Sequence, residues 1–221
     1  MCNKIVHSST VLTLLGGGSA NITQLEQALR IAPHLVAADG GADFAIKCGK
    51  MPASVIGDMD SISSDAKTQI DPENFHHISE QDSTDFEKCL RSIEARAILA
   101  LGFTGGRLDH ELAACSALVR YPSQNCILVG KEDVCFLAPN VFSIDLPKGT
   151  RFSLFPMAQI SGESTGLKYP IGGIEMSPAT RGGTSNEVTG PVTLRFDTRH
   201  MLVLFPVCYL NAALEALLYE T

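Results

Sequence analysis

Short apolar runs alternate with amphipathic stretches through the first 135 residues, and no other feature limits the possible folds of this chain so strongly. Each run has the length of a strand, and the stretches between them carry the spacing of helices. Apolar runs this continuous, separated by helices, indicate an α/β fold with a mostly parallel sheet and helices on both faces. The predicted strands are 10–17, 34–41, 53–58, 75–79, 97–103 and 126–132, and the predicted helices are 21–32, 42–50, 83–95 and 108–121.

The pattern changes near Pro139, after which helical spacing disappears until residues 211–220. Short runs rich in Val, Leu, Phe and Thr follow, separated by Gly and Pro, and such runs predict antiparallel strands joined by turns. We therefore expect two tightly coupled domains, an α/β domain at residues 1–138 and a smaller all-β domain at residues 139–221. A helix at residues 211–220 would close the second domain.

Composition and charge exclude several classes of protein. Hydrophobic residues make up 45% of the chain and charged residues 19%, which is typical of a globular protein. The net charge of -7 argues against a general nucleic-acid-binding surface. We expect a cytoplasmic protein with no membrane contact, because the chain shows neither a signal peptide nor a long apolar run. Seven scattered cysteines without a C-x-x-C pair favour neither a disulfide framework nor a zinc ribbon.

Four loops that follow predicted strands or open predicted helices combine carboxylates with glycines or hydroxyl groups. In open α/β sheets, ligands bind beyond the carboxyl ends of the strands, where loops and helix N-termini gather. We therefore expect the four loops to face one cleft. The loops are Asp39-Gly40-Gly41, Gly57-Asp58-Met59-Asp60-Ser61, Asp82-Ser83-Thr84-Asp85 and Gly105-Gly106-Arg107-Leu108-Asp109-His110.

The spacing of the acids predicts a site for a divalent cation. In an extended segment Asp58 and Asp60 would project to the same side. Asp82 and Asp85 are expected to open a helix, where a spacing of three stacks them beside Lys88. Two carboxylates about 4 Å apart repel by roughly 4 kcal/mol at an effective dielectric of 20, and Mg²⁺ is a hard cation that relieves such repulsion. Taken alone, the helix start has a simpler interpretation, in which Asp82 is an N-cap and Asp85 a favourable first-turn charge.

Glycines beside these acids let backbone N–H groups approach phosphate oxygens. Gly16-Gly17-Gly18, between the first predicted strand and helix, is a further candidate. It is neither a Walker A motif nor a G-x-G-x-x-G motif, because Asn21 stands where the third glycine would be. Arg107, a permanent cation in an acidic, glycine-rich loop, is the better candidate for holding phosphate.

Six segments in order, DGGAD, GDMDS, QDSTDFEKCL, GGRLDH, TGLKYP and TSNE, resemble the motif set of the thiamine pyrophosphokinases. The resemblance extends from Asp39 to Asn186. It implies a nucleotide-binding catalytic α/β domain followed by a thiamine-binding β-sandwich, in a homodimer whose active sites are shared between subunits. It further implies an Mg²⁺-dependent transfer of diphosphate from ATP to the thiamine hydroxyl, with release of AMP.

The resemblance also implies roles for individual residues. Asp58, Asp60, Asp85 and Asp109 would serve Mg²⁺ and catalysis, with Asp85 or Asp109 accepting the hydroxyl proton, while Arg107 and Lys88 would neutralise phosphate charge. Lys168, Tyr169, Ser185 and Asn186 would line the thiamine pocket. Further contacts to the substrates are implied at Asp39, Gly40, Gly41, Gln81, Asp82, Thr84, Gly105, Gly106 and His110. Met59 stands where many relatives have Phe, and Tyr169 where some have Trp.

Three other functions fit parts of the sequence. Tyr169 leaves room for a diphosphokinase acting on another hydroxymethyl heterocycle, such as a pterin, because few pocket contacts set specificity. A non-catalytic nucleotide-binding or thiamine-sensing module is a second, which the repulsion among the acids argues against. The third is a serine hydrolase, because residues 162–166 match G-x-S-x-G around Ser164, with Asp197 and His200 following. That motif needs a strand running into a helix, which Pro170 and the nearby glycines disfavour.

Overall fold

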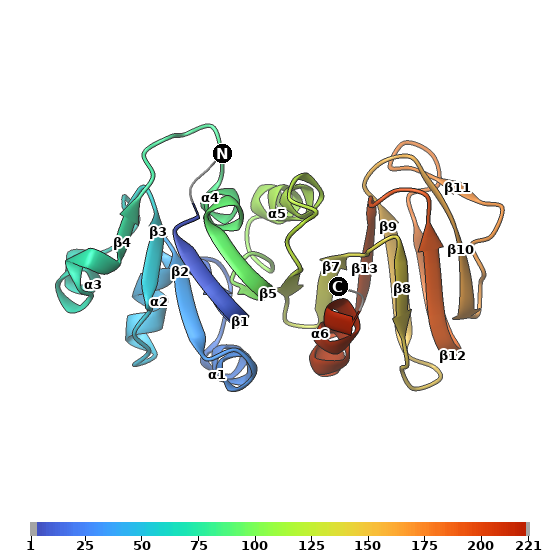
Figure 1. The fold of residues 1–221 in the computed structure, drawn as a ribbon, viewed down its shortest axis with the longest axis horizontal. Helices are drawn as coiled ribbons and strands as arrows, with labels where there is room; N and C mark the ends of the chain where they lie inside the picture. The colour runs from blue at the N-terminus through green and yellow to red at the C-terminus, as the bar shows by residue number, and fades with distance from the viewer. Residues whose placement is uncertain (1–3, 220–221) are drawn as a thin grey trace. The chain divides into compact units, whose positions relative to one another are not determined.

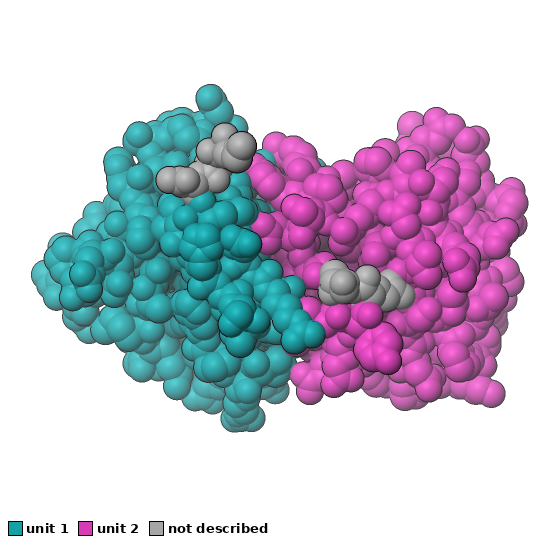
Figure 2. Space-filling view, in the orientation of Figure 1, with its two compact units in different colours: residues 1–117 teal, residues 118–221 magenta. Residues whose placement is uncertain are grey.

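The computed structural model describes residues 4–219 of the chain, so Cys2 and Glu220, the last residue of the predicted final helix, lie outside the described part. The chain divides into two compact units between residues 117 and 118 (Figure 2). The boundary expected from the sequence, between residues 138 and 139, lies later in the chain. The division of function between two domains stays a prediction.

The first unit is built on a parallel sheet, which confirms the expected α/β class (Figure 1). Its strands lie in the order β5-β1-β2-β3-β4, so the chain steps outward from β1 to β4 and then returns to the other side of β1. That reversal between β1 and β5 is a topological switch point, where open α/β sheets bind ligands. The strands are β1 (Val6–Leu15), β2 (His34–Ala38), β3 (Ser54–Gly57), β4 (Phe75–His77) and β5 (Ile93–Leu101).

Helices connect these strands and pack against the sheet. Because parallel crossovers are right-handed, the return from β4 to β5 places α4 on the face opposite α1 and α2. Local capping explains where two helices begin, since Asn21 with Gln24 and Thr84 with Glu87 form capping boxes at α1 and α4. The short helix α3 and the 3₁₀ turn η1 were not predicted from the sequence. The elements are α1 (Ile22–Ile31), α2 (Gly41–Lys47), α3 (Ser64–Gln69), η1 (Pro72–Asn74), α4 (Asp85–Ser92) and α5 (Leu108–Arg120).

The strand register brings the polar loops to one edge of this sheet. Leu15, the last residue of β1, pairs with Ala37 of β2 and with Leu101 of β5. Ala38 pairs with Ile56, so the residues after β2 lie beside those after β3. The glycines after β1 and β5 and the aspartates after β2 and β3 therefore lie at the same carboxyl edge, as expected.

A small apolar core supports the loop that carries Asp58 and Asp60. Ala37, Val55 and Ile62 are buried together, and the half-buried Met59 side chain packs against this cluster. Met59 is therefore a packing residue that anchors its loop. Its backbone has φ 64°, which bends the loop between the two aspartates.

The second unit is antiparallel, with strands in the order β11-β10-β12-β9-β13-β7-β6 and β8 paired to β12. β6 was expected in the parallel sheet but pairs with β7 in an antiparallel manner. β12 is 13 residues long, and Gly190 and Pro191 interrupt its pattern without ending the strand. The elements are β6 (Cys126–Val129), β7 (Asp133–Leu137), β8 (Val141–Ile144), β9 (Arg151–Pro156), β10 (Ile160–Leu167), β11 (Glu175–Met176), β12 (Thr184–Phe196), β13 (Met201–Pro206), η2 (Val207–Tyr209) and α6 (Leu210–Tyr219).

β12 pairs with different strands along its length. Residues 184–187 pair with β9, and residues 192–196 pair with β8 and β10. The single strand thus ties together two sets of antiparallel neighbours. Within residues 4–219, no helix has the length and apolar character needed to cross a membrane.

Candidate active site

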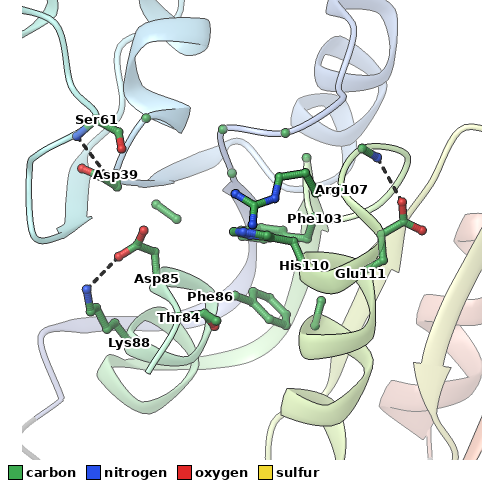
Figure 3. A pocket seen from close by; sticks show the side chains of 18 of the residues that line it. Asp39, Ser61, Thr84, Asp85, Phe86, Lys88, Phe103, Arg107, His110 and Glu111 are labelled. Atoms are coloured by element: carbon green, nitrogen blue, oxygen red, sulfur yellow. Dashed lines mark hydrogen bonds and ion pairs between the residues drawn. The ribbon is translucent and has the colours of Figure 1, made fainter. Parts of the chain in front are cut away.

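A cavity of about 530 Å³ opens at the carboxyl edge of the parallel sheet in the first unit (Figure 3). Residues that follow β1, β2, β3 and β5 line it together with the first turns of α4 and α5. All four loops that were expected to share a cleft contribute residues to the lining of this cavity. The predicted site residues that line the cavity are Asp39, Gly40, Asp58, Gln81, Thr84, Asp85, Lys88, Gly106, Arg107 and His110.

Lys88 is the buried cation of the site. Its side chain is 2% exposed, and its Nζ donates to Asp58 Oδ2 at 3.2 Å and to Asp85 Oδ1 at 3.0 Å. Gln81 Nε2 donates to the same Asp58 oxygen at 3.0 Å. Burial opposes ionisation of Asp58, but these hydrogen bonds outweigh it and lower its pKa to about 2. Burial likewise opposes the charge on Lys88, and its two aspartate partners nevertheless raise its pKa.

The start of α4 fixes Lys88 and Asp85 relative to each other. Thr84 is the N-cap, so α4 begins at Asp85, and Lys88 lies one turn further on the same face. Asp82 lies in the loop before the cap, which corrects the expectation that Asp82 opens the helix with Asp85. Phe86 packs on Phe103, with ring centroids 4.4 Å apart, and this contact joins α4 to the segment after β5.

Asp39 joins Asp58 and Asp60 in a group of three carboxylates whose oxygens lie within 4.8 Å of one another. Asp39 is 2% exposed and has φ 39°, a left-handed conformation that Asp tolerates better than most residues. Its Oδ2 accepts a hydrogen bond from Ser61 N at 3.3 Å, whereas its Oδ1 is buried without a partner. Burial, and then the charges of Asp85 and Asp58, raise the pKa of Asp39 despite the Ser61 hydrogen bond.

The geometry of this group differs from the expected one in two respects. Asp58 and Asp60 come together through the bend at Met59, with Asp60 N donating to Asp58 Oδ1 at 3.4 Å, and not through an extended segment. Asp39 belongs to the group, although the sequence favoured Asp85 and Asp109 as further metal ligands. Asp85 faces Lys88, and Asp109 faces Arg107.

The glycines allow the strand ends to approach closely. A Cβ at Gly18 would lie 2.5 Å from the carbonyl oxygen of Gly102, and one at Gly41 would lie 2.1 Å from that of Leu15. Gly41 therefore supports the site through backbone packing and does not line the cavity. Gly16, Gly17 and Gly18, a weak signal in the sequence, all line it.

The segment between β5 and α5 forms the opposite wall. Arg107 donates to Asp109 through Nε at 3.1 Å and through Nη2 at 2.6 Å. The side chains are 74% and 64% exposed. The hydrogen bonds between them lower the pKa of Asp109 and raise that of Arg107. Glu111 accepts hydrogen bonds from the backbone N–H groups of Gly105 and Gly106.

The four residues expected to line a thiamine pocket lie together in the second unit. Asn186 is buried on β12, where its side chain receives the Tyr169 N–H at 3.0 Å and donates to the Tyr169 carbonyl at 2.7 Å. Lys168 Nζ lies 5.8 Å from the centroid of the Tyr169 ring and 3.6 Å from Glu187 Oε2. Ser185 is exposed on the other face of β12. Tyr169 is 57% exposed, so this cluster presents an aromatic surface.

Several lining residues were not predicted. Glu111 carried only the signal of an acid in the first turn of α5, and Phe86 was expected on the apolar face of its helix. The other additions carry no distinctive sequence signal. They are Ala38, Gly102, Phe103, Thr104 and Ala114, whereas Ser61 and Ser83 belong to loops that were expected to face the cleft.

The G-x-S-x-G match is accidental. Ser164 lies inside β10, and its Oγ accepts a hydrogen bond from Ile171 N at 3.1 Å. The Asp197 Oδ1 atom accepts the N–H of Ser161 at 3.1 Å. Because β10 does not run into a helix, Ser164 lacks the strand-to-helix turn that exposes such a nucleophile.

Known proteins resemble this chain over both units. Residues 25–129 match the family model for the catalytic domain of thiamin pyrophosphokinase. Thiamine pyrophosphokinase 1 of Oryza sativa subsp. japonica is 30% identical over 156 residues, covering 62% of this chain and 59% of that protein. Thiamine pyrophosphokinase 1 of Arabidopsis thaliana is 27% identical over 230 residues, covering 83% of this chain and 86% of that protein. The match to thiamine pyrophosphokinase 2 of Arabidopsis thaliana covers 61% of that protein, so two of these plant relatives are spanned over less than two thirds of their length.

A solved structure shares the fold. The crystal structure of thiamin pyrophosphokinase from Geobacillus thermodenitrificans has a TM-score of 0.73 and 24% sequence identity, covering 89% of this chain and 97% of that one. The fold, the ordered motifs and the catalytic-domain match agree with one another. The chain is therefore similar to thiamin pyrophosphokinases in its catalytic-domain sequence, along most of its length and in its fold.

Proposed function

We propose that this chain is a thiamine diphosphokinase, which transfers diphosphate from ATP to the hydroxyl group of thiamine and releases AMP. The observation that carries the proposal is the group formed by Asp39, Asp58 and Asp60, because Asp39 and Asp58 line a glycine-rich cavity in a chain that matches the catalytic domain of thiamin pyrophosphokinase over residues 25–129. The thiamine hydroxyl would attack the β-phosphorus in line, with AMP leaving. Positioning and charge neutralisation would supply most of the rate, because phosphoryl transfer asks little covalent work of the protein.

The carboxylate group fits Mg²⁺. Its donors are all hard oxygens, and the buried, unpartnered Asp39 Oδ1 fits the role of a ligand atom for such a cation. The raised pKa of Asp39 has the same physical origin, since burial and neighbouring carboxylates oppose its charge. Asp39, Asp58 and Asp60 would hold the ion, which when bound neutralises charge on the transferring phosphoryl group. The further ligand roles of Asp85 and Asp109 remain part of the proposal.

Other residues of the cavity would hold the phosphates and the reacting hydroxyl. Arg107 would bind phosphate oxygens, while Lys88 would fix Asp58 and Asp85 and offset their charge. Asp85, whose second oxygen faces the cavity (Figure 3), is one candidate to accept the hydroxyl proton, and Asp109 is the other. Additional contacts are proposed for Gly40, Gly41, Gln81, Asp82, Thr84, Gly105, Gly106 and His110.

The second unit would recognise thiamine. The exposed ring of Tyr169 beside Lys168 offers a flat surface that suits the aminopyrimidine ring and the cationic thiazolium. We extend the proposal to a β-sandwich layout for this unit, with Asn186 shaping the pocket through its hydrogen bonds to the Tyr169 backbone and with Ser185, on the other face of β12, kept as a proposed thiamine contact. We also extend it to a cytoplasmic homodimer in which each active site draws on both subunits.

A coupled assay of AMP release tests the proposal. The purified protein is supplied with ATP and Mg²⁺, with and without thiamine, and the mass of the product is determined. We expect thiamine-dependent AMP release with thiamine diphosphate as the product, and no release after chelation of Mg²⁺. Asp58→Asn should lower turnover by at least about 100-fold, the loss expected when a preorganised electrostatic partner is removed.

A matched control separates this effect from a general loss of charge. Asp65→Asn removes one carboxylate from the exposed first turn of α3 and should leave turnover unchanged. Turnover with a hydroxymethylpterin and none with thiamine would reassign the substrate while keeping the reaction. ATP binding without AMP release from either substrate would leave a binding module in place of an enzyme.

A further inference from the structure

The loop before α5 directs two consecutive backbone N–H groups at one carboxylate oxygen. Gly105 N lies 2.9 Å and Gly106 N lies 3.0 Å from Oε1 of Glu111. Gly105 has φ 81°, a left-handed conformation that lets successive N–H groups converge. Converging backbone N–H groups form an anion-binding concavity of the kind that holds phosphate. Here a side chain of the same protein occupies it.

The guanidinium beside this loop also binds a carboxylate of the same protein. Arg107, the next residue in the chain, donates two hydrogen bonds to Asp109. Asp109 and Glu111 both belong to the first turn of α5. This turn therefore supplies acids to both kinds of anion donor in the segment, the backbone N–H pair and the guanidinium.

These contacts lie on the wall of the cavity. Gly106, Arg107 and Glu111 all line it. Ser19, from the glycine-rich segment after β1, lies close to the same loop, since a Cβ on Gly106 would be 3.6 Å from Ser19 Oγ. A carboxylate at this place adds a negative charge where a polyphosphate would lie. A helix that needed only a favourable first-turn charge would not require its acid to face the cavity.

We propose that Glu111 is an internal competitor for phosphate. Its carboxylate occupies an anion subsite formed by the backbone N–H groups of Gly105 and Gly106, and it leaves this subsite when a polyphosphate binds. The inference rests on the proposed function only in requiring that the cavity take up a polyphosphate. Glu111 is thus a positioning residue that sets the affinity of the cavity for phosphate and takes no part in the chemistry.

Calorimetric titration without thiamine tests this role, using Mg²⁺-ATP and inorganic tripolyphosphate as the two probes. Glu111→Gln keeps an oxygen that can accept both hydrogen bonds but removes the charge, whereas Glu111→Ala removes both. Both variants should bind both probes about threefold to tenfold more tightly, the scale of one partly exposed charge interaction. The gain should shrink as ionic strength rises, because salt screens exposed charges.

Glu94→Gln is the matched control. Glu94 carries the same charge and is 67% exposed near the beginning of β5, at the edge of the sheet opposite the cavity. It should bind both probes with the affinity of the unmodified protein. Tighter binding by this variant as well would trace the effect to net charge and overturn the role of Glu111.

Two further results would overturn the inference. Weaker binding by Glu111→Ala, with Glu111→Gln unchanged, would show that Glu111 only holds the loop in shape. Equal affinity in all the proteins would show that no competition occurs. If none of the proteins bound either probe, both the inference and the proposed function would be rejected. If the Glu111 variants bound the probes more tightly but the protein showed no thiamine-dependent AMP release, the inference would stand and only the proposed function would be rejected.

Discussion

The two walls of the cavity are built in opposite ways. On one wall Lys88 is 2% exposed and joins Asp58 to Asp85, with Gln81 as a further donor. On the other wall Arg107 and Asp109 are 74% and 64% exposed. The side-chain hydrogen bonds of this wall join residues of the short segment 105–111 to one another. The first wall is fixed by burial before any ligand arrives. On the second wall, the Arg107 guanidinium and the backbone N–H groups bind carboxylates in solvent-exposed contacts. Solvent weakens these contacts, and a ligand can replace them.

The largest effect is expected from breaking the buried wall. Lys88→Met keeps an unbranched side chain one atom shorter but leaves Asp58 and Asp85 without the cation that joins them. We expect the free energy of unfolding to fall by about 3 kcal/mol, because removing one partner of a buried ion pair leaves uncompensated charge. Urea denaturation measures the change.

An exposed lysine provides the control for this substitution. Lys47→Met on α2 should change the free energy of unfolding by less than about 0.5 kcal/mol. A similarly small effect of Lys88→Met would contradict the view that this wall is held by its buried cation.

The loss of stability in acid should also distinguish the two walls of the cavity. Because the pKa of Asp58 is lowered to about 2 in the folded protein, its contribution to stability is complete above its unfolded pKa near 3.8 and is lost as the pH falls from about 4 towards 2. Asp58→Asn should remove this part of the acid dependence, which amounts to at most about 2 kcal/mol. Stability measured by denaturation between pH 2 and 7 gives the slope.

Asp109→Asn is the comparison from the exposed wall. Its pKa is also lowered, by hydrogen bonds from Arg107, but both side chains are largely in solvent. Its acid dependence should therefore match that of the unmodified protein. An equal loss of slope in both variants would remove the distinction between the two walls.

The smallest effect on stability is expected at Arg107. Arg107→Ala breaks an exposed pair within one segment, so the free energy of unfolding should change by less than about 1 kcal/mol. Binding of Mg²⁺-ATP should nevertheless weaken by about tenfold, since a bidentate phosphate contact is lost. Thermal melting and calorimetric titration on the same sample measure both quantities, and a large loss of stability with unchanged binding would reverse the assignment.

Much of this site could be predicted because strand ends in a parallel sheet meet at one edge. Applied to the apolar runs, that rule predicts that Asp39, Asp58, Asp85 and Arg107 share one cleft. All four line the cavity. The i,i+3 spacing was enough to pair Asp85 with Lys88.

Side-chain pairing was harder to predict because it depends on local backbone angles. The left-handed conformations of Asp39 and Met59 direct three carboxylates together, and spacing along the sequence does not encode such angles. The sequence named Asp109 as a metal ligand but did not predict its hydrogen bonds with Arg107, two residues away in the chain. Glu111 was missed for the same reason, since its partners are backbone groups that any sequence would have.

In the second unit, the double pairing of β12 has a consequence for how that unit comes apart. One half of the strand is hydrogen bonded to β9, and the other half is hydrogen bonded to β8 and β10. If β12 separated from either set of neighbours, backbone groups of the strand and of those neighbours would lose their hydrogen-bond partners. We therefore expect local opening to be coupled along β12. The hydrogen bonds between Asn186 and Tyr169 should then open only when the surrounding strands open as well.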